Sequence, residues 1–576
     1  MHKAFLVATW VFTAVAASGL RPTVNINNGT VVGVDLPQFG QSLFLGIPYA
    51  QPPVGDLRLR PPRSINTSFG QLDASAYGPH CWSAFTTGID DNTPFNNSED
   101  CLTLNVIRPH GLFENTPVPV LVWIHGGGLT TGGSADLRYN GTYLVQASVA
   151  NGNPIIFVSI NYRLASLGFL GGKALAEEGS LNLGLRDQRL ALHWVQENIA
   201  NFGGDPKKVT IHGESVWFKI VLHVLSHVDL CLTVGGSSVH AQIIAYAGRD
   251  DKLFNQAIVQ SDTWNGNFSL PDASIYQATY DSLLAETNCT NSSGSAQLSC
   301  IRTLPIDRFR QSSVGVTGML FDGDFLNVPG VMPAYRAGNW VKVPFLVGSN
   351  TDEGRTFAPS GANTTADVEA IMGLLVPAEH ISEALELYPD VPGLGCPFNT
   401  GDFQLDPVQN GIFATPGAQN KRVAAFVGDV LTAAGPRWLA QEISSQVPFW
   451  KYRFNHQPYA VTFGVEDYIG HFVEVAYVFN SQNNDTDFWI KNQFHATYLG
   501  AGAPIADRFL GVSMSRAWAS FAATGDPNNA NVSSKLHWPK YSEGGENMVW
   551  QTQGSVIEKD KFREEGMKFI MDKVFF

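Results

Sequence analysis

The sequence has 576 residues, of which 44% are hydrophobic and 15% are charged, and its formal net charge is −14 at pH 7. A chain of this length can bury a large core. The acidic balance argues against nucleic-acid binding, because phosphate groups would be repelled.

The first 19 residues are typical of a secretory signal peptide. A basic start at Lys3 is followed by a short apolar core and by small residues near a cleavage point between Ala17 and Gly19. The apolar run is shorter than a membrane anchor requires, and the C-terminus lacks the hydrophobic tail of a lipid anchor. We therefore expect a secreted, extracellular protein without a stable membrane anchor.

Sequons and cysteines agree with export. Ten Asn-x-Ser/Thr sequences together support a glycoprotein, and six cysteines fit an oxidising compartment. Cys81 with Cys101, and Cys289 with Cys300, are local pairs that could each close a surface loop, which leaves Cys231 and Cys396. The candidate glycosylation sites are Asn28, Asn66, Asn96, Asn140, Asn267, Asn288, Asn291, Asn363, Asn484 and Asn531.

Apolar runs bounded by Gly or Pro alternate with helical patterns along the rest of the chain. Strands are predicted within 24–50 and at 99–106, 118–125, 154–162, 209–211, 256–260, 343–347 and 448–454. Helices are predicted at 187–200 and 514–524 and within 273–316 and 366–440. This alternation predicts an α/β fold with a large, mostly parallel central sheet and helices on both faces. Without repeats or a low-complexity linker, residues 20–576 are expected to form one domain with surface insertions.

The strand at 209–211 leads into Gly213-Glu214-Ser215, the first half of a Gly-x-Ser-x-Gly turn. Such a turn lifts a serine oxygen clear of the end of a sheet. The residue two positions beyond Ser215 is Trp217, and a matching glycine occurs only at Gly235. Residues 216–234 are therefore interpreted as an interruption of the turn.

Three explanations of the interruption stay open. It is an unspliced intron or gene-prediction error, which we favour, or a real insertion that abolishes the turn, or a real insertion that the fold tolerates. Lys219, His223, His227 and Asp229 argue against a membrane span. The two histidines lack a convincing set of further ligands, so we expect no metal site.

Hydrolysis of an ester through a serine needs a nucleophile, a base, a group that orients the base, and donors for the oxyanion. Ser215 is the candidate nucleophile, and His471, in a loop before an apolar segment, is the candidate base. Glu353 follows a buried strand and could orient the histidine, with Asp352 as its rival. The order serine, acid, histidine is that of α/β-hydrolase triads.

A strand at 118–125 runs into His125-Gly126-Gly127-Gly128. Glycines let main-chain N–H groups approach a carbonyl oxygen without obstruction, so this turn fits an oxyanion hole. A further donor is expected from the residue after the nucleophile, which is Val216 as the sequence stands.

Together these motifs resemble the type-B carboxylesterase/lipase family, which includes cholinesterases and fungal lipases. The resemblance spans essentially the whole mature chain and implies the α/β-hydrolase fold. It is carried in order by EDCLTLNV at 99–106, HGGG at 125–128, the run from Leu181 to Ser215, the Glu353 loop, GHFVEVAYVF at 470–479 and FAATGDPN at 521–528.

The resemblance also implies roles for individual residues. Ser215 would be the nucleophile, His471 the general base and then acid, and Glu353 the orienting carboxylate. Oxyanion N–H groups would come from Gly127 and Gly128. Two disulfides would join Cys81 to Cys101 and Cys289 to Cys300.

We accordingly expect a secreted serine hydrolase that cleaves small-molecule or lipid carboxylic esters through an acyl-enzyme and needs no cofactor. The loop between Cys81 and Cys101 has few apolar residues for an amphipathic lid, which favours a carboxylesterase over a lipase acting on acylglycerols. The interrupted turn leaves a second alternative, a non-catalytic binding protein on the same fold. The oligomeric state stays open.

Overall fold

The structure is a computed structural model of the 576-residue chain. It describes residues 21–83, 96–111, 117–215, 219–222, 228–231, 235–262, 268–290, 294–312, 317–400, 417–459, 469–481, 502–529 and 536–575. The expected signal peptide, and the sequons at Asn267, Asn291, Asn484 and Asn531, lie outside these residues.

An 11-stranded sheet forms the centre, in the order β18-β17-β16-β15-β14-β11-β9-β10-β8-β4-β3. The neighbours from β17 through β10 pair in parallel, while β18 at one edge and β8, β4 and β3 at the other pair antiparallel. The prediction of a mostly parallel sheet is confirmed. The strands are β3 (Val34–Leu36), β4 (Gln41–Pro48), β8 (Thr103–Pro109), β9 (Val118–Ile124), β10 (Ile156–Ile160), β11 (Gly204–Glu214), β14 (Gln256–Gln260), β15 (Phe345–Asn350), β16 (Phe449–Phe454), β17 (Glu546–Trp550) and β18 (Val556–Lys559).

Both faces of this sheet are covered because its central strands are apolar on both sides. Along β9, Val120, Val122 and Ile124 belong to one buried cluster, whereas Leu121 and Trp123 belong to another. Successive side chains of a strand point to opposite faces, so each cluster occupies one face. The first cluster includes side chains of α4 (Leu183–Asn198), α5 (Gly235–Gly248), α9 (Val331–Ala337) and α14 (Ala434–Ile443), and the second those of α1 (Gly141–Ala150), α15 (Val475–Val478) and α16 (Ile505–Thr524).

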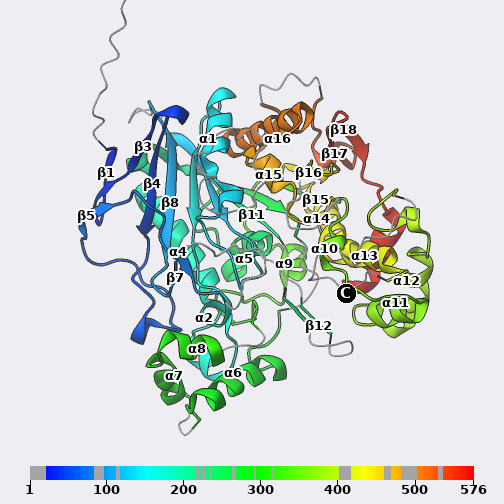
Figure 1. Cartoon of the computed structure of the whole chain (residues 1–576), viewed down its shortest axis with the longest axis horizontal. Helices are drawn as coiled ribbons and strands as arrows, with labels where there is room; N and C mark the ends of the chain where they lie inside the picture. Colours follow the sequence, from blue (N-terminus) through cyan, green and yellow to red (C-terminus); the bar gives the residue numbers. More distant parts are fainter. Residues whose placement is uncertain are drawn as a thin grey trace, which may run out of the picture.

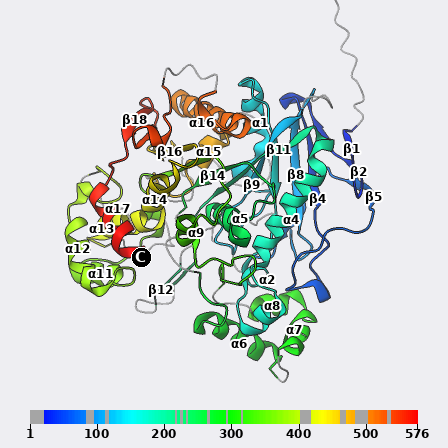
Figure 2. The same cartoon turned by 180° about the vertical axis from the view of Figure 1, so that it is seen from behind.

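Two further groups of helices lie at the periphery (Figures 1 and 2). The first group is α6 (Ser274–Thr287), α7 (Ser295–Arg302) and α8 (Ile306–Ser312), which share a third buried cluster with residues from 167–183. The second group, near the C-terminus, is α11 (Thr365–Met372), α12 (Ile381–Leu387) and α13 (Asn420–Gly428). None of the helices in the described ranges is both long and apolar enough to cross a bilayer.

The cysteines pair as the resemblance implies. Disulfides join Cys81 to Cys101, with an S–S distance of 1.97 Å, and Cys289 to Cys300, with an S–S distance of 2.01 Å. Cys396 is a buried free thiol.

The sequon at Asn140 is where the structure disagrees with the glycosylation pattern. The Asn140 side chain is buried, and its oxygen accepts hydrogen bonds from the N–H and the hydroxyl of Thr142, which caps the start of α1. A side chain held in this way is a poor glycan acceptor. The described sequons at Asn66, Asn96, Asn288 and Asn363 are exposed, and Asn28 is half-buried.

A buried ion pair ties α4 to the chain just after β10. Arg163 and Asp187 are 2% and 0% exposed, and two guanidinium N–H groups donate to the carboxylate over 2.6 and 2.8 Å. The Arg163 backbone N–H donates to the same carboxylate over 3.0 Å.

Replacing Asp187 by alanine is therefore expected to lower the free energy of unfolding by about 3–5 kcal/mol, because the guanidinium stays buried without its counter-ion. Urea unfolding of the D187A variant measures this loss. As a matched control, E177A removes the partner of an exposed ion pair with Lys173 and is expected to change stability by less than about 1 kcal/mol. Equal effects of the two substitutions would contradict the expectation.

Candidate active site

The candidate nucleophile lies at the end of β11, where the parallel ladder reaches its last hydrogen bond. Ser215 follows Glu214 directly and has a φ of 97°. Its backbone N–H donates to the Gln260 carbonyl over 2.8 Å, which extends the pairing of β11 with β14 by one residue. A positive φ is unfavourable for a residue with a side chain, so the surrounding structure must hold this turn.

The turn closes although residues 216–234 interrupt it. α5 begins at Gly235, and the Gly236 N–H donates to the Ser215 carbonyl over 2.9 Å. A Cβ at Gly236 would lie 2.6 Å from the Asp262 Cβ and 3.0 Å from the backbone carbonyl oxygen of Ser215, so only glycine fits.

Within the interruption, β12 (Lys219–Leu222) and β13 (Val228–Cys231) form a separate antiparallel pair, away from the central sheet (Figures 1 and 2). Both ends of the turn therefore meet through the hydrogen bond from the Gly236 N–H to the Ser215 carbonyl. A closed turn is what the third explanation, a real insertion that the fold tolerates, requires.

Three predicted side chains form one hydrogen-bonded chain. The Ser215 hydroxyl is hydrogen-bonded to Nε2 of His471, and Nδ1 of His471 lies 2.6 Å from Oε2 of Glu353. All three are buried. A neutral imidazole that donates from Nδ1 to a carboxylate leaves Nε2 to accept a hydrogen bond from a serine hydroxyl.

Glu353 is itself held from two sides. Its other oxygen, Oε1, accepts the Ser261 hydroxyl at 2.5 Å and the Asn350 N–H at 2.8 Å. Asp352, the rival candidate, instead accepts the Phe398 N–H at 2.9 Å, and burial raises its pKa. Glu353 is thus the carboxyl group that is hydrogen-bonded to His471, whereas Asp352 accepts from the Phe398 N–H.

The glycine turn after β9 lies against the nucleophile. A Cβ on Gly126 would approach the Ser215 Cβ to 3.3 Å, and one on Gly127 would lie 2.2 Å from the Thr131 oxygen. Gly127 and Gly128 have φ values of 105° and 72°, which favour glycine. Val216, the further expected donor, lies outside the described residues.

His125, at the start of this turn, has a structural role. Burial lowers its pKa to about 3, so the imidazole is neutral. The ring stacks on Tyr162 with centroids 4.4 Å apart, and the Tyr162 hydroxyl donates to the His125 carbonyl.

Two carboxyl groups that the sequence did not point to, Glu214 and Glu474, lie near the histidine. Glu214 Oε1 lies 3.2 Å from His471 Nε2, and burial, followed by the charges of Glu474 and Glu353, raises the pKa of Glu214 well above its ordinary value. Burial and the Glu353 charge raise the pKa of Glu474 to about 7. Glu474 accepts hydrogen bonds from Gln260 at 2.8 Å and Asn350 at 2.6 Å.

The sequence offered only weak signals for these groups. Glu214 lies inside the nucleophile turn, and Glu474 follows His471 by three residues. Both are 0% exposed, and the burial of a carboxyl group is not visible in a pattern of residue types.

Comparison with known proteins agrees with this geometry. The model of the "Carboxylesterase family" matches residues 20–570. The chain belongs to this family. It is similar to "Lipase 4" of Diutina rugosa, with 32% identity covering 96% of this chain and 97% of that lipase, and to "Secreted lipase 1" of Botryotinia fuckeliana, with 32% identity covering 96% and 92%. The crystal structure of Aspergillus niger EstA, 27% identical, superposes with a TM-score of 0.76 over 96% of this chain and 99% of EstA.

The raised pKa of Glu474 predicts a pH dependence of stability. The folded protein holds a proton here up to about pH 7, whereas a glutamate in the unfolded chain loses it near pH 4.3. Folding therefore binds protons between these values, and stability falls as pH rises through this window. In E474Q the decrease in the free energy of unfolding between pH 5 and pH 8 should be smaller than in the parent protein by about 1–3 kcal/mol.

Urea unfolding at pH 5, 6.5 and 8 measures the difference. E177Q, which neutralises an exposed glutamate, serves as the control and should keep the slope of the parent protein. If the free energy of unfolding of E474Q depended on pH as it does in the parent protein, Glu474 would be ionised throughout the window, which would contradict the prediction.

Proposed function

We propose that this protein is a serine hydrolase that cleaves carboxylic esters through an acyl-enzyme. The observation that carries the proposal is the continuous hydrogen-bonded chain from Ser215 through His471 to Glu353, beside the glycine turn at 126–128. Membership of the carboxylesterase family supports it.

The residues suggest a two-step cycle. Nε2 of His471 takes the proton of Ser215 as the hydroxyl attacks the ester carbonyl, and the N–H groups of Gly127 and Gly128 are proposed to stabilise the oxyanion. The imidazolium, stabilised by Glu353, then gives its proton to the leaving alcohol. Water, activated by the same histidine, hydrolyses the acyl-enzyme.

We further propose that residues 1–19 are removed as a signal peptide and that residues 20–576 form one secreted catalytic domain. The names of the relatives support secretion, since proteins from Botryotinia fuckeliana and Gibberella zeae are both called secreted lipases.

Two ester classes compete as substrates. Few apolar residues between Cys81 and Cys101 favour soluble esters, although residues 84–95 of this loop lie outside the described part. The relatives named lipases favour acylglycerols. Rates on dissolved p-nitrophenyl butyrate and on emulsified trioleoylglycerol separate the classes, and a clear preference for the emulsion would overturn our choice of a carboxylesterase.

S215A is expected to lower kcat on p-nitrophenyl butyrate by about 10⁵–10⁶-fold, because no other group takes the place of the nucleophile. A fluorophosphonate should add to Ser215 of the parent chain, detected by peptide mass, and should not label S215A. S282A, at an exposed helical serine, is the control and should keep the parent rate. Parent activity in S215A would contradict the mechanism.

The interruption leads to a further test, in which a single alanine replaces residues 216–234 and restores Gly-Glu-Ser-Ala-Gly. Since Gly236 already meets the Ser215 carbonyl, both the parent and the shortened chain should hydrolyse p-nitrophenyl butyrate. Activity in the shortened chain alone would mean that the segment is foreign to the protein. Inactivity of both would favour the second candidate, a binding protein on the same fold.

A further inference from the structure

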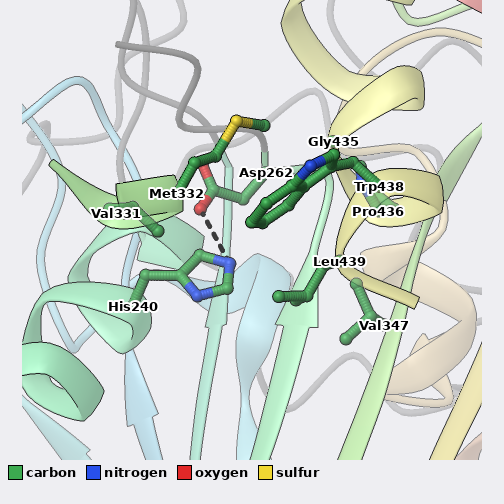
Figure 3. A pocket seen from close by; sticks show the side chains of 9 residues that line it. All are labelled: His240, Asp262, Val331, Met332, Val347, Gly435, Pro436, Trp438 and Leu439. Carbon is green, nitrogen blue, oxygen red and sulfur yellow. Dashed lines mark ion pairs between the residues drawn. The ribbon is translucent and has the colours of Figure 1, made fainter. Parts of the chain in front are cut away.

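A second polar cluster lies beside the nucleophile turn and has no part in the proposed mechanism. Ser237 and His240 are on the first turns of α5, and Asp262 follows the end of β14. The Ser237 hydroxyl donates to Oδ1 of Asp262 over 2.5 Å, and Nε2 of His240 lies 3.5 Å from Oδ2 (Figure 3).

The cluster adjoins a cavity of about 10 Å³, room for roughly one water molecule. His240 and Asp262 lie next to each other in its wall, joined by the contact drawn as a dashed line in Figure 3, and the rest of the wall is mainly apolar. The other lining residues are Val331, Met332, Val347, Gly435, Pro436, Trp438 and Leu439.

Burying a carboxylate in such apolar surroundings costs free energy unless the carboxylate is hydrogen-bonded. Asp262 has a fully buried side chain. Burial lowers the pKa of His240 to about 3, so its ring is neutral, and its Nδ1 is hydrogen-bonded to the Tyr335 hydroxyl. Within the cluster, the hydrogen bond from Ser237 at 2.5 Å is a closer contact to this carboxylate than the 3.5 Å approach of His240.

Three consecutive residues at the end of β14 hold three parts of the active site. The Gln260 carbonyl accepts the N–H of Ser215, the Ser261 hydroxyl donates to Glu353, and Asp262 accepts from Ser237 on α5. The end of β14 therefore connects the nucleophile, the orienting acid and the helix that follows the turn.

That helix needs such a connection because 19 residues separate Ser215 from Gly235 in the sequence. Among the described residues, the Ser215 carbonyl joins the two sides by accepting hydrogen bonds from the Gly236 N–H at 2.9 Å and from the Ser237 N–H at 3.4 Å. The unfavourable φ of Ser215 persists only if its surroundings over-determine it.

We propose that Asp262 is a positioning residue for ester hydrolysis: by accepting the Ser237 hydroxyl, it fixes the first turn of α5 against the Ser215 carbonyl and keeps the nucleophile aligned with His471. In the full chain it replaces the direct peptide connection that residues 216–234 interrupt. This role rests on the proposed function.

The test compares D262A, S237A, the double variant and D262N in the full chain, using kcat and KM for p-nitrophenyl butyrate and the melting temperature. D262A and S237A should each lower kcat by about 10–100-fold, since a displacement of about 1 Å costs up to about 10²-fold, with KM within about two-fold of the parent. The double variant should match the single ones. D262N keeps an acceptor for Ser237 and should retain most of kcat.

V331A is the matched control, because it removes a small buried group from the wall of the same cavity. It should keep the parent kcat even if its melting temperature falls as far as that of D262A. A parent kcat in D262A, or an equal loss of kcat in V331A, would overturn the positioning role. If D262A does not fold, the comparison of S237A with D262N tests the role instead. Equal kcat values in S237A and D262N would then overturn the positioning role.

The chain in which one alanine replaces 216–234 gives a second measurement. There the peptide bond holds α5 to Ser215 directly, so D262A should lower kcat by no more than a few-fold. An equally large loss in both chains would overturn the claim that Asp262 replaces the missing connection. A parent chain inactive on all esters would instead overturn the proposed function, and this role with it.

Discussion

The register of three neighbouring parallel strands, β11, β14 and β15, is the constraint on which the active site depends. Glu214 pairs with Gln260, and Gln260 pairs with Gly348, so the three strands end at one edge of the sheet. The residues that follow them, Ser215 and Ser261, continue the ladder through their backbone N–H groups. A slip of one residue would turn each of these side chains to the opposite face, and the serine could no longer meet a histidine 256 residues away.

Much of this arrangement was predictable because its signals are local. The strand at 256–260 has the predicted bounds, and the glycine turn after β9 and the histidine at 471 lie at the edge where the motifs indicated. That Ser215, Glu353 and His471 meet was not derivable from spacing. It followed from the chain order of a known family, since nothing in a periodic pattern relates residues so far apart.

Other elements escaped prediction for physical reasons. α16 begins at Ile505, whereas the sequence predicts a helix only from 514. Its first turn carries a charged residue, Asp507, whose carboxylate accepts the Tyr477 hydroxyl and lies 2.8 Å from Nε2 of His456. Such buried polar contacts make a helix start look like an exposed loop. The carboxyl groups of Glu214, Glu474 and Asp262 escaped for the same reason, since a sequence records charge but not the depth at which it is buried.

The buried carboxyl groups also explain how one histidine can serve several neighbours. Glu353 accepts the N–H of the imidazole. The pKa of Glu214 is raised well above its ordinary value, and that of Glu474 is raised to about 7, so Glu474 holds a proton below about pH 7. Below that pH fewer negative charges compete for the imidazolium.

The small sheet of β12 and β13 has a consequence for the architecture of the polypeptide. Its first and last residues, Lys219 and Cys231, lie opposite each other, so the chain leaves and re-enters the fold at neighbouring points. A backbone cut between these two strands would divide the protein into two pieces that still share the β11–β14 ladder. The serine would then reside on one polypeptide and its histidine and glutamate on the other, which is the arrangement of a split reporter whose signal depends on reassembly of its halves.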